Sequence, residues 1–452
     1  MIQLKNNLTT KKEIFIPIKD KEVSMYVCGV TLYDDIHIGH LKSILTFEVL
    51  RNYFKEKGFK VKFVRNITDI DDKIIKKALE LNEDPLVLVN QYIDIYHNLL
   101  NELEINKPDI EPRVTEYLNE IVDYVENLKN KGFAYQVEDG IYFDTSKIEH
   151  EVYPLSKKVI SELQESEDKA RQYKRKGSDF ALWKRDETYG YKNKHFHTLG
   201  RPGWHIECSV MHHHTLGEKF DIHGGGRDLI FPHHENEITQ SHAHNGVNPA
   251  NYWIHNGMMT KNGKKLSKSE GNSIYVKDII QKYSKEGLKL FLAKGQYNQS
   301  QEYNEEELLE AHQRFLDFSS IMNGLSYNEK YHSIFKEVID ALEDDLNTPK
   351  VVVLIYSAMK ELKTTLSFQQ ANEIIKVLKL LAVIPEKIEA FDLYLRWKEY
   401  NKPSKEILEK FEERNKAKNS KNFVLSDSIR KELKNLGWSI LDKKEGSILL
   451  KD

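Results

Sequence analysis

The segment His37-Ile38-Gly39-His40 combines two imidazoles with a glycine, a combination suited to holding phosphate groups. It follows an apolar, β-rich run and opens a pattern of apolar residues at helical spacing, which predicts a junction from strand to helix. A helix N-terminus offers unpaired N–H groups and positive potential, and Gly39 lets a nucleotide approach the backbone. We therefore predict a nucleotide site at this segment.

A second segment, Lys261 to Asn272, carries four lysines and is flanked by glycines. This composition is typical of a mobile loop, and its ammonium groups could close over a polyphosphate. Either segment alone is a weak indication of function.

Four side chains from three distant parts of the sequence have the donor chemistry of a metal site: Cys28, Cys208, His233 and Glu237. With Pro232 in the first turn of a predicted helix, His233 and Glu237 are four residues apart and project from one face. Two thiolates, an imidazole and a carboxylate suit Zn²⁺, and the long gap between the cysteines excludes a zinc finger built from local loops. Taken singly, each cysteine could instead be a small buried apolar residue, and a disulfide is formally possible but disfavoured in a cytosolic protein.

These residues require a fold that brings distant segments together. Glu22–Val30 and Lys60–Ile67 have strand-like patterns and bracket a helix predicted from His40 to about Lys57, which is the order of a βαβ unit. With a further predicted strand at Tyr252–Met259, the pattern indicates an α/β fold with a parallel, Rossmann-like sheet, whose ligands bind at the carboxyl ends of the strands. From about Glu302 to Lys398 the spacing of apolar residues is helical, as in a helix bundle.

An insertion is predicted between the two halves of this sheet. A charged, helical stretch from about Asp84 to Lys131 leads into strand-like alternation at Phe133–Thr145. The predicted domains are a first half of the Rossmann domain (1–113), a connective insertion (114–199), the second half (200–255), a junction domain with the lysine segment (256–310), a helical bundle (311–400) and a small C-terminal domain (401–452).

Composition limits the class of protein. The chain has 452 residues, 40% hydrophobic and 30% charged, enough for two to four domains with a large core. It has no run of about 20 apolar residues and no signal-peptide core, so a cytoplasmic protein without a membrane partner is expected. The net charge of −3 argues against indiscriminate nucleic-acid binding, although lysine-rich faces can still contact RNA.

Further segments of the sequence, taken with the two nucleotide motifs, match the pattern of a known family. They are Met25–Gly29 with Thr31 and Tyr33, Asn66–Lys73, Gly200–Ser209, Phe220–Gly226 and Asp228–Glu237. With them the chain, from about Phe15 to its C-terminus, resembles the class I aminoacyl-tRNA synthetases and, within that class, the cysteinyl-tRNA synthetases of bacterial type. The resemblance implies an α/β fold of the class I synthetase type, followed by an α-helical bundle and a small C-terminal anticodon-binding domain.

The resemblance also implies the residues of two substrate sites. The ATP site, which takes ATP with Mg²⁺, would comprise Gly29, Thr31, His37, Gly39, His40, Gly224, Gly226, Asp228, Lys265 and Lys268, with His37, His40, Lys265 and Lys268 as the catalytic residues. The site for L-cysteine would comprise Cys28, Thr68 and Trp204. One Zn²⁺ on the four predicted ligands would receive the substrate thiolate and so separate cysteine from serine.

Several of these residues have plainer explanations. Trp204 could be ordinary core packing, and the run Gly224–Gly226 could be a turn. The run His212–His214 falls outside the matched ligand positions and is expected to be solvated or structural. In some relatives, lysines near Lys73 and in the lysine segment hold pyridoxal phosphate. For this chain such a side activity is one interpretation of these lysines, and a solvated lysine face is the plainer one.

The implied partners are tRNA-Cys, L-cysteine and ATP, and bacterial members are expected to be monomers. Anticodon contacts are expected at Phe423, Asp427, Arg430 and Asp442, where Phe423 replaces a more usual tryptophan that would also stack on a base.

Departures from the family pattern leave alternatives open. Val30 replaces a proline, Leu41-Lys42 replaces alanine-arginine, and Gln296–Gln299 replaces a His-Tyr-Arg-Ser run, which removes a cation beside the lysine segment. One rival is a ligase that passes cysteine to a small amine, which would not need the tail after Pro403. A second is a catalytically silent RNA-binding paralogue, against which the intact motifs argue. A zinc hydrolase fits least, because four protein ligands leave no position for water.

Overall fold

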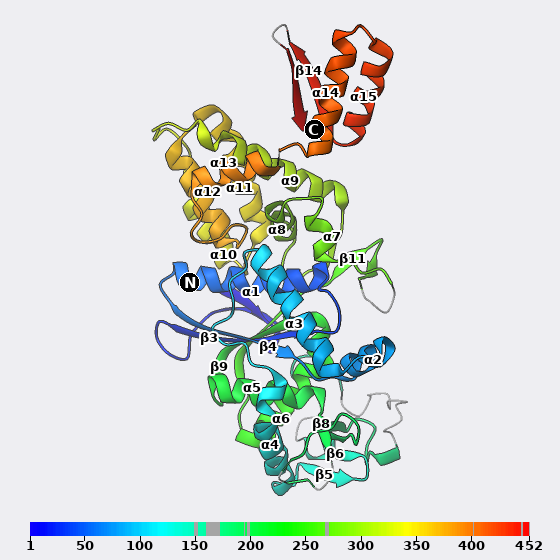
Figure 1. The fold of residues 1–452 in the computed structure, drawn as a ribbon. Coiled ribbons are helices and arrows are strands. Elements are labelled where there is room, and N and C mark those ends of the chain that lie inside the picture. The colour runs from blue at the N-terminus through cyan, green and yellow to red at the C-terminus, as the bar shows by residue number, and fades with distance from the viewer. Residues whose placement is uncertain are drawn as a thin grey trace.

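The structure is a computed structural model that describes residues 1–148, 152–159, 172–193, 195–196, 199–266, 271–400, 402–443 and 446–451. Its parts follow one another along a long axis (Figure 1). The insertion lies at one end, the parallel sheet follows, and the helical bundle and a separate C-terminal domain lie at the other end. Among these residues no helix is both long and apolar enough to cross a bilayer.

The central sheet has four parallel strands in the order β10-β9-β3-β4. The strands are β3 (Glu22–Thr31), β4 (Lys60–Thr68), β9 (Phe220–Gly226) and β10 (Ala250–Asn256). The chain runs from β3 outward to β4 and later returns to place β9 on the other side of β3. The strand order therefore reverses between β3 and β9, the crevice in which open α/β sheets bind ligands.

Helices cover both faces of this sheet (Figure 1). The helices are α1 (Ile38–Glu56), α5 (Trp204–Leu216) and α6 (Glu235–Asn245). Met25 and Val27 pack in one core with apolar residues of α1, while Tyr26 and Cys28 belong to a second core with α5 and α6. This follows from the alternation of side chains along a strand, and it directs Cys28 away from α1.

The predicted β-α-β order is confirmed, and two predicted elements differ in extent. The strand predicted at Tyr252–Met259 ends at Asn256, because Gly257 lies so close to the next segment that a Cβ atom there would be 2.1 Å from the Gln299 carbonyl oxygen. The helical stretch predicted from Asp84 to Lys131 is interrupted around Pro108 and Pro112, where proline removes backbone donors.

The insertion combines helices with a small antiparallel sheet of order β5-β6-β7-β8. Its elements and the two helices that precede it are α2 (Asp72–Leu81), α3 (Pro85–Glu102), α4 (Leu118–Asn130), β5 (Ala134–Val137), β6 (Gly140–Phe143), β7 (Phe180–Arg185) and β8 (Gly200–Pro202). The buried Asp179 joins two of its segments, since its carboxylate accepts hydrogen bonds from the Thr145 amide (2.9 Å) and the Tyr135 hydroxyl (2.7 Å).

The remaining elements form the junction, the bundle and the C-terminal domain. They are β1 (Gln3–Asn6), β2 (Lys11–Ile14), β11 (Met259–Lys261), β12 (Lys264–Lys265), α7 (Val276–Ile280), α8 (Lys285–Ala293), β13 (Gln301–Glu302), α9 (Glu305–Ser320), α10 (Phe335–Glu343), α11 (Thr348–Thr365), α12 (Phe368–Leu380), α13 (Ala390–Tyr400), α14 (Lys405–Asn419), α15 (Phe423–Asn435), β14 (Trp438–Lys443) and β15 (Gly446–Lys451). The predicted bundle is confirmed, and the C-terminal domain has its own small core.

The departure at Gln296–Gln299 has a structural role. Three of its side chains hydrogen-bond to Asp345: the Gln296 amide to the carbonyl (2.8 Å), and Tyr297 and Asn298 to the carboxylate (2.8 and 3.1 Å). The run therefore joins the junction domain to the turn between α10 and α11.

Candidate functional site

The two histidines of the first motif cap the N-terminus of α1. His37 is the N-cap residue, and its Nδ1 accepts a hydrogen bond from the Gly39 amide at 3.1 Å. His40 Nδ1 accepts from the His37 amide at 3.3 Å, and the two rings stack with centroids 3.7 Å apart. Because both Nδ1 atoms accept, each ring carries its proton on Nε2 as a donor. The motif therefore presents two N–H donors beside the positive end of a helix.

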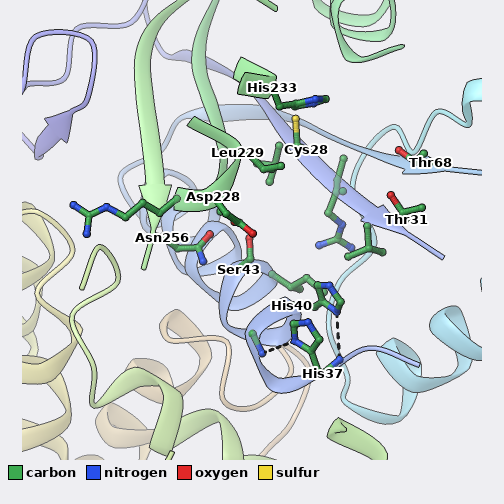
Figure 2. A pocket seen from close by; sticks show the side chains of 18 of the residues that line it. Cys28, Thr31, His37, His40, Ser43, Thr68, Asp228, Leu229, His233 and Asn256 are labelled. Atoms are coloured by element: carbon green, nitrogen blue, oxygen red, sulfur yellow. Dashed lines mark hydrogen bonds between the residues drawn. The ribbon is translucent and has the colours of Figure 1, made fainter. Parts of the chain in front are cut away.

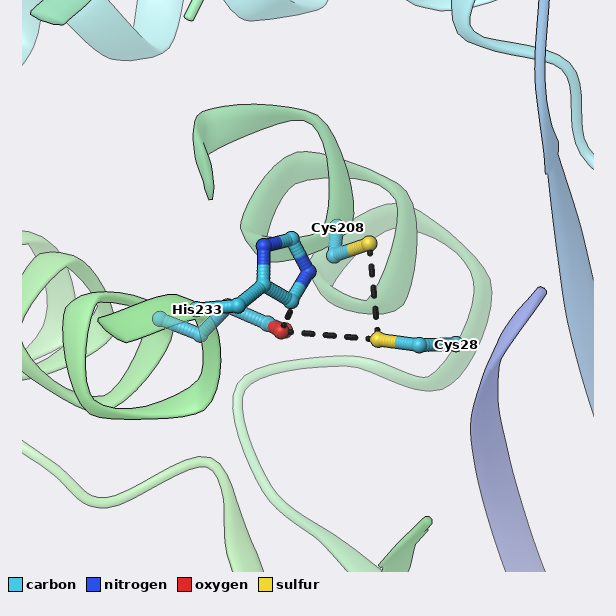
Figure 3. Close-up of side chains that lie close together, drawn as sticks. Cys28, Cys208 and His233 are labelled. Carbon is cyan, nitrogen blue, oxygen red and sulfur yellow. Dashed lines mark hydrogen bonds and ion pairs between the residues drawn. The ribbon is translucent and has the colours of Figure 1, made fainter. Parts of the chain in front are cut away.

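The four predicted metal ligands converge, although they come from β3, α5, the helical turn before α6 and α6 itself; Figure 3 labels Cys28, Cys208 and His233. Their donor atoms all lie within 4.8 Å of one another and all four residues are buried. The Sγ atoms of Cys28 and Cys208 are 3.6 Å apart, and Cys28 Sγ is 3.5 Å from Glu237 Oε1. His233 Nε2 is 3.1 Å from the same carboxylate oxygen.

These separations fit tetrahedral zinc. With ordinary zinc–ligand bond lengths, a tetrahedron places two sulfurs about 3.8 Å apart, sulfur and oxygen about 3.5 Å apart, and nitrogen and oxygen about 3.3 Å apart. A turn of helix, Ile230–His234, leads into α6 and has non-helical backbone angles only at Phe231. The predicted helical path from Pro232 therefore holds, and it places His233 one turn before Glu237.

A second layer of histidines orients the ligands. His223 Nε2 lies 2.9 Å from Glu237 Oε2, the oxygen that faces away from Cys28. His233 Nδ1 lies 3.1 Å from His205 Nδ1, so the other ring nitrogen of His233 is engaged as well. Such outer partners fix the tautomer and direction of metal ligands.

The electrostatics of the ligand set favour a cation. Burial alone would raise the pKa of the Glu237 carboxyl, but His223 and His233 outweigh it and hold that pKa well below its usual value. The hydrogen bond from Cys28 is the main cause that lowers the pKa of Cys208 to about 6, whereas burial raises the pKa of Cys28. Two thiols and a carboxylate that share one buried space suit a dication, which stabilises all three as anions.

Most of the predicted substrate residues line one cavity of about 430 Å³ (Figure 2). The predicted residues on its wall are Cys28, Gly29, Thr31, His37, Gly39, His40, Thr68, Trp204, Cys208, Gly226, Asp228, His233 and Lys265. In the figure Cys28 and His233 lie at one end of the cavity and His37 and His40 at the other. The metal ligands and the helix N-terminus therefore face one shared space.

Close packing accounts for two of the glycines that were predicted in the ATP site. A Cβ atom at Gly29 would lie 1.6 Å from the Asn66 carbonyl oxygen, so this position must be glycine for β3 and β4 to pair. Gly224 does not line the cavity, and a Cβ atom there would lie 2.3 Å from the Phe47 ring. Packing of α1 on β9 is therefore a sufficient reason for the glycine at 224.

The lysine segment reaches the same cavity. Lys265 Nζ lies 3.1 Å from Asp228 Oδ2, which joins two residues predicted for the ATP site. Lys268 lies outside the described residues. The backbone after the segment is attached to the histidine motif, since Tyr275 forms a β-bridge with His37 and Lys277 pairs with Asp35 at 2.5 Å.

The predicted anticodon residues lie in the C-terminal domain, far from the cavity. Phe423 is 60% exposed, and Asp427 and Arg430 follow it on one face of α15. Asp442 binds Arg430, Lys418 at 2.8 Å and Arg414 at 2.7 Å. Hydrogen bonding to Arg414, followed by the other two cations, holds the pKa of Asp442 far below its usual value.

Sequence reasoning missed residues around the site that carry no local signal. His205 and His223 occur inside the quoted motifs but were assigned no role. Arg65 and Asn256 also line the cavity. The His212–His214 run is partly buried, and His212 lies 3.8 Å from Glu237, too far for a hydrogen bond.

A family model described as the class I (C) tRNA synthetase catalytic domain matches residues 14–313. Among curated proteins, the chain is 39% identical to a cysteine–tRNA ligase of Pyrococcus abyssi, over 99% of this chain and 98% of that protein. It is 36% identical to a cysteine–tRNA ligase of Methanococcus vannielii, over 100% of this chain and 99% of the relative. These relatives are archaeal, so they lend no support to the prediction of a bacterial-type member.

Solved structures show the same fold at low sequence identity. A methionyl-tRNA synthetase of Mycobacterium tuberculosis in complex with methionyl-adenylate has a TM-score of 0.58 at 12% identity and covers 82% of this chain and 93% of its own. A putative arginyl-tRNA synthetase of Campylobacter jejuni has a TM-score of 0.51 at 14% identity, covering 84% and 94%.

Proposed function

Because the chain belongs to the cysteine–tRNA ligase family of class I tRNA synthetases, we propose that it activates L-cysteine with ATP and transfers it to tRNA-Cys. The observation that carries this proposal is the shared cavity, with a thiolate-selective ligand set at one end and phosphate donors at the other. Zn²⁺ is the metal that the donor set fits. The protein is proposed to act as a cytoplasmic monomer.

ATP is proposed to bind across the carboxyl ends of β3 and β9. Gly39 and the start of α1 approach its phosphates, and His37 and His40 donate to them from Nε2. Asp228 accepts from the ribose hydroxyls, beside Gly226 at the end of β9. Lys265 and Lys268 neutralise the phosphates, with Mg²⁺ as the accompanying ion. Gly29 and Thr31 complete the site.

L-Cysteine is proposed to lie at the other end of the cavity. Cys28, Cys208, His233 and Glu237 would hold the zinc, and Thr68 and Trp204 would contact the ammonium and carboxylate of the substrate. When bound, zinc supplies a Lewis acid that prefers a thiolate to a hydroxyl, which distinguishes cysteine from serine. His223 and His205 orient the carboxylate and imidazole of the ligand set.

Activation needs no nucleophile from the protein. A carboxylate oxygen of cysteine attacks the α-phosphorus of ATP, the bond to the bridging oxygen breaks, and pyrophosphate leaves with that electron pair. The cavity places the two substrates together, and His37, His40 and the lysines stabilise the charge that develops on the phosphates. A ribose hydroxyl of the terminal adenosine of the tRNA then attacks the carbonyl carbon, and AMP leaves. The C-terminal domain is proposed to bind the anticodon.

Cysteine-dependent ATP–pyrophosphate exchange on zinc-loaded protein tests the first step, with serine as the control amino acid. Charging of a tRNA transcript with a GCA anticodon, measured in parallel, tests the second. Exchange with cysteine alone together with charging supports the proposal. Exchange without charging would point to the ligase that uses a small amine, and no exchange would point to the silent paralogue.

A further inference from the structure

Arg65 is a buried cation on the wall of the proposed active-site cavity. The residue is only 2% exposed, yet it lines the cavity together with Cys28, Thr31 and His40. Within the described part of the chain, no carbonyl or carboxylate accepts a hydrogen bond from its three side-chain nitrogens, and the neutral hydroxyl of Tyr96 is the polar group with which it interacts.

The surroundings of Arg65 supply no counter-charge. The guanidinium carbon lies 5.9 Å from the centre of the Phe63 ring. Tyr96 is itself buried, and burial raises the pKa of its hydroxyl, while the charge of Arg65 and a hydrogen bond from it oppose that rise. A phenol that keeps its proton does not neutralise a guanidinium, which stays charged in proteins.

Arg51 shows what a structural arginine looks like in the same core. It is 4% exposed and lies 5.4 Å from the same Phe63 ring. Its guanidinium donates to the Lys107 carbonyl (2.9 Å) and to Asp109 (2.9 Å), and it does not line the cavity. Arg65, by contrast, lines the cavity and has neither a carbonyl nor a carboxylate as acceptor among the described residues.

An unpaired buried charge is unfavourable, so a site that retains one is organised to receive an opposite charge. We propose that Arg65 is an oxyanion-binding residue, whose guanidinium holds the carboxylate of L-cysteine or the α-phosphate of ATP. This inference rests on the proposed function, which requires both anions in this cavity. A planar guanidinium can grip either group with two parallel hydrogen bonds.

The position of Arg65 in the sheet fits this role. In the β3–β4 register Arg65 pairs with Val27, directly before the ligand Cys28. The next residue, Asn66, accepts a hydrogen bond from the Gly29 amide at 2.9 Å. Strand β4 therefore holds the Gly29 backbone in place through Asn66 and also carries Arg65, which lines the cavity.

The test compares Arg65→Met and Arg65→Lys with the matched control Arg51→Met. Without substrates, R65M should unfold at the same temperature as the wild type or higher, because it removes an unpaired buried charge. R51M should unfold at a lower temperature, because it leaves Asp109 without its cation. In pyrophosphate exchange, R65M should lose about 100-fold or more in kcat/KM, R65K should lose an intermediate amount, and folded R51M should retain its activity.

Binding measurements separate the two anions. If Arg65 holds the carboxylate, R65M should bind cysteine and cysteamine equally, whereas the wild type prefers cysteine. If it holds the phosphate, R65M should lose affinity for AMP but keep its affinity for adenosine. Wild-type exchange rates in both R65M and R65K would overturn the inference, as would destabilisation of R65M equal to that of R51M. These tests of Arg65 require a wild-type protein that is active in pyrophosphate exchange. An inactive wild type would refute the proposed function instead.

Discussion

Single residues at this site have two tasks, and His37 is an example. Its Nδ1 caps α1, and the residue also lines the cavity in which ATP is proposed to bind. We expect His37→Ala to lower the free energy of unfolding by about 1 kcal/mol through loss of the cap. His37→Asn should keep the cap, because asparagine is a good N-cap residue, yet both variants should lose about 100-fold in kcat for pyrophosphate exchange. Wild-type exchange by H37N would show that this histidine only caps the helix.

We expect His223 to act on the proposed zinc through Glu237. We expect His223→Leu to weaken zinc binding about 10- to 100-fold, because Glu237 Oε2 loses its partner at 2.9 Å. Competition with a chelating indicator measures this affinity. His212→Leu is the matched control, because His212 is equally buried but lies 3.8 Å from the same oxygen.

Thiol titration gives an independent readout of the same site. The chain has two cysteines, both buried and both proposed as zinc ligands, so a chelator should convert zero reactive thiols into two per chain. Equal loss of affinity in H223L and H212L would contradict the specific role of His223, and reactive thiols in the zinc-loaded protein would contradict the ligand set.

At the scale of elements, α8 carries a buried charge where it packs against the bundle. Lys289 is 1% exposed and donates to the Val383 carbonyl at 3.2 Å. Burial lowers the pKa of Lys289 to about 8, against the opposing charges of Glu286 and Glu104 and with help from Lys285 and Arg396. Between pH 8 and about 10.5 the unfolded chain therefore binds more protons than the folded one, so this residue's contribution to stability rises with pH through that window.

Lys289→Met should remove this pH dependence. Relative to K289M, the wild type should gain up to about 3 kcal/mol in the free energy of unfolding as pH rises from 8 to 10.5. Urea unfolding at several pH values measures this difference in the free energy of unfolding, and Lys282→Met, at an exposed lysine, is the control. Parallel curves for the wild type and K289M would show that Lys289 titrates normally.

At the scale of the whole molecule, we expect the chain to separate activation from tRNA recognition. The C-terminal domain has its own core, built around Ile407, Ile429, Leu433 and Trp438, and it stands apart from the catalytic sheet (Figure 1). A chain that ends after α13 should keep cysteine-dependent exchange within about twofold of the full chain. Its tRNA charging at limiting tRNA should fall at least about 100-fold, because one of two linked binding surfaces is lost. Loss of exchange in the truncated chain would show that the domain supports the catalytic half.

Local patterns in the sequence were sufficient to predict several elements and motifs. The strands β3 and β4, the helix α1 between them and the bundle after Glu302 each have a periodicity that depends only on neighbouring residues. The histidine motif was predicted at a helix N-terminus for the same reason, and it is found there. The two cysteines, the imidazole and the carboxylate were identified as a donor set by their chemistry and by resemblance.

Only the tertiary structure decided which of these groups meet. Cys28 and Cys208 are brought to 3.6 Å because β3 and α5 pack together, a contact that no local spacing encodes. The second oxygen of Glu237 meets His223 through a contact between α6 and β9, and Gly224 proves to be a packing position. Arg65 resembles any other arginine in a strand until the fold shows that it is buried, unpaired and turned toward the cavity. Periodicity is set by the local backbone, whereas burial and pairing depend on strand order, and strand order is a property of the whole chain.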